Sequence, residues 1–131
     1  VKLTTTDKKV KLNPVLNAED IIYFQQLIRR IPVPDNVYEY AVKLATSTRP
    51  NTELANAKVN EYVNWGAGPR ASQYLMSGAK THAAINGRFS PDIADVRAVA
   101  EPILRHRIVR NYKAEAEGIT VEDIITELVK G

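Results

Sequence analysis

An arginine at the start of a predicted helix has the clearest potential for chemistry in this sequence. Gly66 and Gly68 allow backbone angles that other residues avoid, and Pro69 suits the first position of a helix. Arg70 then lies in the first turn, where the helix dipole is already positive and a cation is unfavourable. A bound anion would compensate both positive charges, and phosphate is the usual ligand of such a site.

Arg70 also has a simpler interpretation, as a side chain that points into water or towards a nearby carboxylate. Helix-start chemistry alone favours this simpler interpretation. The sequence contains no GxxxxGK[ST] phosphate-binding loop, no acidic strand end suited to magnesium and no nucleophile–base–acid set. We therefore predict that this chain alone does not hydrolyse ATP. The histidines, His82 and His106, have no partner at ligand spacing, so we predict packing or hydrogen-bonding roles and no metal site.

The composition is that of one ordinary folded domain. Of the 131 residues, 44% are hydrophobic and 25% are charged. The sequence has no cysteine, which excludes disulfides and thiolate metal sites and agrees with a reducing cytoplasm. A net charge of +3 is too small to indicate nucleic acid by itself. No membrane-length apolar run or signal peptide is apparent, so we expect a cytoplasmic protein; because it begins with Val1, we expect a fragment of a longer one.

Hydrophobic spacing and capping residues predict an almost all-helical fold. Asn17 can cap a first helix, in which Ile21, Phe24 and Ile28 follow helical spacing. Asn86-Gly87 can end a later helix with a left-handed cap. We expect four main helices near residues 18–31, 35–49, 69–86 and 91–105, and a C-terminal helix near 121–129.

Two further expectations concern the remaining segments. Arg88-Phe89 could form a short strand that pairs with the segment before Gly66. Trp65 is expected to pack against the helix bundle rather than to stack on a base. Pro102 should kink or split the fourth helix, because proline removes a backbone donor and clashes with the preceding turn.

Basic residues gather after the fourth predicted helix. As a functional signal they could meet phosphate, nucleic acid or an acidic partner. As a structural feature they are the charged tail of a helix end, which is the favoured interpretation from these residues alone. The basic cluster comprises Arg105, His106, Arg107, Arg110 and Lys113.

The segment Gly-Ala-Gly-Pro-Arg-Ala-Ser at 66–72 resembles the motif that opens the sensor-2 helix in the lid of MoxR-type AAA+ ATPases. Three later segments, 86–89, 95–98 and 103–108, are similar to the rest of that lid and follow in the same order. The resemblance extends from about Val15 to Ile108, which is most of the chain. One departure is Gly68, where the family pattern often has serine, so the helix start loses a side-chain cap.

The resemblance implies an all-α fold: a four-helix lid-type bundle with an extra C-terminal helix and at most a small two-stranded β element. Residues 1–17 would be a linker from an upstream nucleotide-binding domain, 18–110 the lid, and 111–131 a C-terminal helical extension. Arg70 would be the catalytic sensor-2 arginine, directed at the γ-phosphate. Gly68, Pro69 and Ala71 would line the nucleotide site with it.

The same resemblance implies ATP and Mg²⁺ as ligands of the full-length enzyme, with neither bound tightly by this chain alone. The full-length protein would form a homo-oligomeric ring, expected to be a hexamer. It would couple ATP hydrolysis to chaperone-like remodelling or assembly of an unidentified client protein, with no membrane or nucleic acid as partner. The basic cluster would face the nucleotide-binding domain or the adjacent subunit.

The alternative is a free-standing helical binding module that uses the basic cluster on nucleic acid or an acidic protein. This alternative requires the cluster to form one continuous basic face, whose affinity would fall steeply with salt. The lid interpretation instead requires Arg70 at a helix start with open space in front of it.

Overall fold

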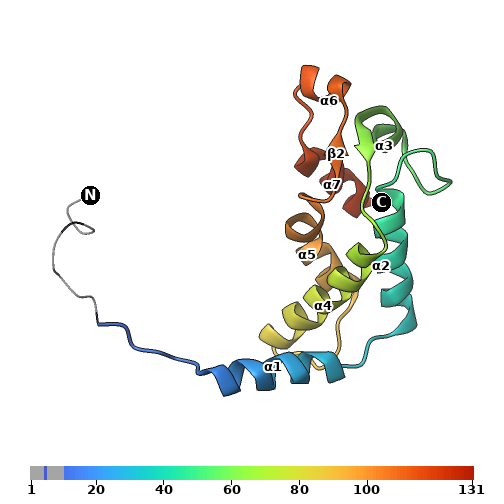
Figure 1. Cartoon of the computed structure of the whole chain (residues 1–131). Coiled ribbons are helices and arrows are strands. Elements are labelled where there is room, and N and C mark those ends of the chain that lie inside the picture. The colour runs from blue at the N-terminus through green and yellow to red at the C-terminus, as the bar shows by residue number, and fades with distance from the viewer. Residues whose placement is uncertain (1–4, 6–10) are drawn as a thin grey trace.

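A computed structural model describes Thr5 and residues 11–131, so the expected linker at 1–17 lies mostly outside the described residues. The described chain forms a helical bundle with one small β element, which confirms the predicted all-α class (Figure 1). The elements are α1 (Ala18–Arg30), α2 (Asp35–Ser47), α3 (Ala57–Tyr62), β1 (Val63–Trp65), α4 (Arg70–Ile85), α5 (Ile93–Leu104), β2 (Val109–Arg110), α6 (Tyr112–Ala116) and α7 (Val121–Lys130). None of the described helices is long and apolar enough to cross a membrane.

Reciprocal caps fix where three of the helices begin. In each, the N-cap side chain accepts a hydrogen bond from the backbone N–H three residues on, and the side chain there accepts one from the N-cap N–H. Two backbone donors that the helix itself cannot pair are thereby satisfied. The pairs are Asn17 with Asp20 in α1, Asp92 with Asp95 in α5 and Thr120 with Asp123 in α7.

The end of α4 has the left-handed cap that the sequence predicted. Gly87 has a φ of 74°, Arg88 N–H donates to Ala83 O at 2.9 Å, and Gly87 N–H donates to Ala84 O at 3.0 Å. The chain then turns and enters α5. This helix continues through Pro102 to Leu104, so of the two predicted effects, a kink or a split, the split does not occur.

The small β element has a different partner from the one predicted. Strand β1 pairs antiparallel with β2, with Val63 opposite Arg110 and Trp65 opposite Val109. The predicted strand at Arg88-Phe89 is wrong because these residues lie in the turn between α4 and α5. The Arg88 side chain is directed at Asp95 instead.

The core forms where α2, α4, α5 and α7 meet. Leu75 of α4, Leu104 of α5 and Ile124 of α7 are fully buried in one cluster. Gly78 lets α4 and α5 approach closely, since a Cβ at this position would lie 2.9 Å from Ile103 Cδ1. Because α7 contributes to the same cluster, the C-terminal helix is part of the packed bundle.

Helix α1 lies outside this core. It runs across the end of α4, and residues 11–17 lead away from the bundle (Figure 1). Lys80 Nζ donates to Arg29 O at 3.1 Å, and Ser90 Oγ donates to Pro32 O at 3.1 Å. No residue of α1 is buried. The helical spacing of Ile21, Phe24 and Ile28 therefore predicted the helix correctly without leading to burial in this chain.

Candidate functional site

Arg70 occupies the first position of α4. Pro69, just before it, already has helical angles (φ −58°, ψ −30°), and no side chain caps this helix end. The Arg70 side chain is exposed, and it makes no hydrogen bond or ion pair with any residue that the structure describes. The guanidinium therefore remains available to an anion, beside the positive end of the α4 dipole.

The end of α2 holds the loop that leads to Arg70. The Thr48 hydroxyl is buried, donates to Ala45 O at 2.7 Å and accepts from Ala67 N–H at 2.9 Å. Arg49 Nε donates to Ala67 O at 2.8 Å. The backbone N–H and C=O of Ala67 are thus both paired with residues at the end of α2, which fixes the path of the chain into α4.

Gly66 is required by a close approach of two backbones. A Cβ on Gly66 would lie 2.4 Å from Thr48 O and 2.7 Å from Arg49 Cα, whereas a Cβ on Gly68 would meet nothing within 4 Å. Neither glycine has a positive φ, so the interpretation of both as residues with unusual backbone angles is wrong. Tertiary contact, rather than local conformation, explains Gly66.

This difference predicts opposite results for two alanine variants. Gly66→Ala should lower the free energy of unfolding by about 1–3 kcal/mol, because the new methyl group collides with backbone that cannot yield cheaply. Gly68→Ala should be neutral or stabilise by roughly 0.4–1 kcal/mol, because it restricts the unfolded chain without a clash in the fold. Urea unfolding of both variants measures the effect, and equal stability of the two would contradict it.

A pocket of about 400 Å³ lies beside this loop. It is lined by Arg49, Pro50, Asn64, Trp65 and residues 66–69. Trp65 is 72% exposed, so its predicted packing against the bundle is wrong. The strand register is irregular between Val63 and Trp65, which interrupts the alternation of inward and outward side chains and leaves the indole outside.

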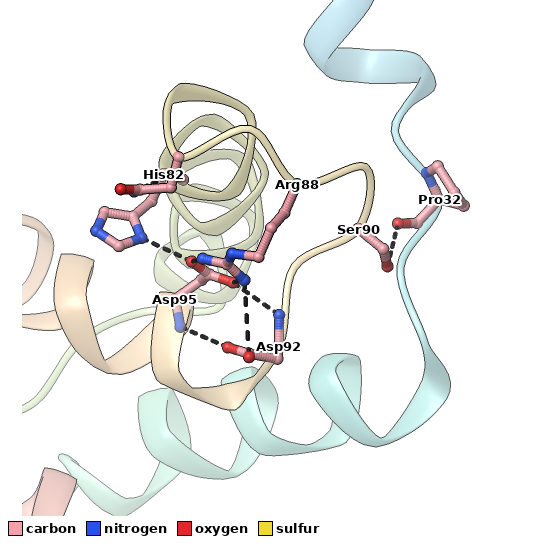
Figure 2. Close-up of polar contacts among 7 residues, drawn as sticks. Pro32, His82, Arg88, Ser90, Asp92 and Asp95 are labelled. Carbon is pink, nitrogen blue, oxygen red and sulfur yellow. Dashed lines mark hydrogen bonds and ion pairs between the residues drawn. The ribbon is translucent and has the colours of Figure 1, made fainter.

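A buried carboxylate joins the other end of α4 to α5 (Figure 2). Asp95 is fully buried and accepts hydrogen bonds from both terminal nitrogens of Arg88 and, at 2.8 Å, from Asp92 N–H. His82 Nδ1 lies 2.6 Å from Asp95 Oδ1, which confirms the hydrogen-bonding role predicted for this histidine. The Arg88 guanidinium, with His82 and Asp92 N–H, holds the pKa of Asp95 well below its usual range despite burial. This cluster fixes the α4–α5 corner.

A family model provides the decisive comparison. The model of the AAA lid domain matches residues 55–128, which is more than half of the chain. The chain belongs to the AAA lid domain family. One of its relatives is named MoxR1, which supports the MoxR-type lid that the sequence motifs predicted.

The relatives are longer proteins. "Chaperone MoxR1" of Mycobacterium tuberculosis is 30% identical over 116 residues, which are 88% of this chain and 31% of the relative. The uncharacterized protein YeaC of Bacillus subtilis is 30% identical over 118 residues, 90% of this chain and 34% of YeaC. The crystal structure of a proposed ATPase from Cytophaga hutchinsonii matches with a TM-score of 0.80 and 32% identity, over 86% of this chain and 34% of that one. The lid thus spans about a third of the length of these relatives.

The basic cluster of the lid is largely engaged in contacts within the fold. The Arg107 guanidinium lies 4.7 Å from the Tyr74 ring centre, and Arg110 Nη1 donates to Ile119 O at 2.6 Å. Lys113 Nζ pairs with the Glu61 carboxylate. These contacts favour the structural interpretation of the cluster.

Sequence reasoning missed two sets of residues that shape the site. Thr48 and Arg49 bind the backbone N–H and C=O of Ala67 from 19 and 18 positions away, respectively, and no local pattern indicates these contacts. Arg88 and Asp95 lie in motifs that carried the resemblance, but their pairing depends on how α4 and α5 pack. Within the described residues, no group of three or more His, Cys, Asp or Glu side chains could hold a metal ion.

Proposed function

We propose that this lid covers the ATP site of a MoxR-type AAA+ ATPase and senses the nucleotide through Arg70. The exposed Arg70 guanidinium, which has no partner among the described residues, is the observation that supports the proposal. A free guanidinium offers a planar pair of donors that suits phosphate oxygens. Gly68 and Pro69, both exposed, would lie beside the same phosphate, and Gly68 leaves open space there. Ala71 is 1% exposed and its backbone N–H donates to Gly68 O, so the proposal gives Ala71 no contact with the nucleotide.

In this proposal Arg70 stabilises the charge that develops on the γ-phosphate during transfer. Mg²⁺ and most phosphate contacts would be supplied by the nucleotide-binding domain of the full-length protein. Release of the phosphate would remove the contact with Arg70. Because Thr48 and Arg49 hold the loop before α4, a displacement of Arg70 would move α2 and α4 together, as in a hinge-type closure.

At the level of the whole protein, we propose a ring, expected to be a hexamer, that couples ATP hydrolysis to remodelling or assembly of a client. The relative named as a chaperone, MoxR1, supports this activity class. The boundaries at 1–17, 18–110 and 111–131 are part of the proposal. The direct test is ATP turnover by the full-length protein with Arg70 replaced by alanine; unchanged turnover with a folded lid would contradict the sensing role.

Mg²⁺-ATP should bind this lid alone weakly or not at all. The reason is that a single guanidinium at a helix end supplies few of the contacts that a phosphate-binding loop provides through its backbone N–H groups. Isothermal titration calorimetry of the 131-residue chain with Mg²⁺-ATP measures this. A submicromolar dissociation constant, corresponding to roughly −8 kcal/mol or tighter, would contradict the lid proposal.

A further inference from the structure

Helix α1 exposes large apolar side chains on more than one side. Tyr23 and Leu27 are one helical turn apart, whereas Ile21, Phe24 and Ile28 follow the spacing of a different side. Only Ile28 among these five is half-buried; the others are exposed. A helix that is apolar on several sides is ordinarily covered on several sides. Contact with α4 accounts for one of them.

The groove between α1 and α4 is also apolar. It has a volume of about 760 Å³ and includes Leu16, Ile21, Phe24 and Ile28 on one wall. The facing wall carries Ser77 and Thr81, but the Thr81 hydroxyl already donates to Ser77 O at 2.8 Å. Gln25, Gln26 and Arg29 also line the groove, so its surface is mainly apolar with a few polar side chains beside it.

The exposed apolar positions continue from α1 into the segment before it. Leu12, Val15 and Leu16 are all exposed. A partner that covers α1 would therefore bury additional apolar surface by covering residues 12–16 as well. This segment leads towards the upstream part of a full-length protein. We name the exposed apolar residues of 12–27 the α1 surface; they are Leu12, Val15, Leu16, Ile21, Ile22, Tyr23, Phe24 and Leu27.

We propose that the α1 surface is the docking surface for the upstream ATPase domain of the same chain. The proposal rests on the proposed function, which places such a domain before this lid, and on the relatives, of which this chain spans about a third. A domain joined close to residue 12 has an effective concentration in the millimolar range at the α1 surface. A separate copy of the protein has no such advantage. Docking there fixes the orientation of α1, and with it the lid, relative to the ATP site.

Hydroxyl-radical footprinting of the full-length protein tests this surface. Tyr23 is the probe, and Tyr112 of α6 is the reference; they are 61% and 85% exposed in this chain. Each labelling rate is divided by the rate of the same tyrosine in denaturant. We expect Tyr23 to be labelled several-fold more slowly than its exposure in this chain implies, both in dilute monomer and in the assembled protein.

Two variants provide the matched control. Ile22 in α1 and Val42 in α2 are each 54% exposed. Ile22→Glu should raise the labelling of Tyr23 because a buried charge opposes docking, whereas Val42→Glu should leave it unchanged. Tyr23 labelling at the rate set by its exposure in this chain would overturn the proposal. Protection only in the assembled protein would also overturn it, by assigning the surface to a second copy. Neither readout depends on Arg70 or ATP, so failure here is distinct from failure of the sensing role.

Discussion

Arg70→Ala should lower ATP turnover by the full-length protein by about 10²–10³-fold, the usual cost of losing one preorganised donor to a developing negative charge. The lid itself should stay folded. Arg70 is exposed, it has no partner in the described chain, and its charge lies at the positive end of α4. Removal of that charge should leave thermal stability unchanged or raise it slightly. Steady-state turnover measured beside thermal melting separates the two effects.

Two further variants sharpen this test. Arg70→Lys should restore turnover only in part, because a point ammonium cannot reproduce the planar pair of donors. Gln73→Ala changes an exposed residue in the same turn of α4 and should keep normal turnover. Normal turnover in Arg70→Ala with a folded lid would mean that Arg70 is only a surface residue. Reduced turnover in Gln73→Ala as well would point to a general effect on the helix end.

The helices were predictable because their start and stop signals are local. Asn17 and Thr120 each cap a helix through a partner three residues away, and Gly87 ends α4 with a positive φ. Such signals depend on a few neighbouring residues. The same reasoning placed Arg70 at the start of α4 through Pro69. The position of Arg70, and with it the position of the candidate site, could therefore be predicted from the sequence.

The parts that sequence reasoning missed depend on contacts between distant segments. Arg88 was assigned to a strand because its local sequence is compatible with one, but pairing with the buried Asp95 determines its conformation. Ala67 is held by Thr48 and Arg49, which lie one helix earlier. Hydrophobic spacing in α1 predicted a helix, yet spacing does not say whether the covering partner belongs to this chain.

Arg88→Met should destabilise the lid strongly at neutral pH. The substitution keeps an apolar stem but removes the bidentate partner of Asp95, whose carboxylate is fully buried. Leaving a buried carboxylate without its charged partner is destabilising. The Arg88 side chain is partly exposed, and His82 and Asp92 N–H remain beside the Asp95 carboxylate, so we expect a smaller loss than for a fully buried ion pair. Urea unfolding at pH 7 measures the loss.

The loss of stability caused by Arg88→Met should become smaller as the pH falls. In the wild type the folded-state pKa of Asp95 is lowered, mainly by Arg88, so its stabilising contribution is present above the unfolded pKa of about 3.9. It is lost as the pH falls through the lowered folded-state pKa. In Arg88→Met the folded-state pKa of Asp95 rises. The variant therefore binds a proton at a pH where the wild type does not, and the difference in stability should narrow as the pH falls through this raised pKa.

Arg97→Met is the control for the loss of an arginine on the same part of the lid. Arg97 lies on the exposed side of α5, and its Nε donates to the Tyr40 hydroxyl at 3.1 Å. Because an exposed contact of this kind contributes little, the control should change stability by less than about 1 kcal/mol, with no narrowing in acid. If the difference in the free energy of unfolding between Arg88→Met and the wild type stays constant from neutral pH into acid, Arg88 acts through packing alone. The Asp95 carboxylate would then be held in the α4–α5 corner by His82 and the α5 cap without help from the ion pair.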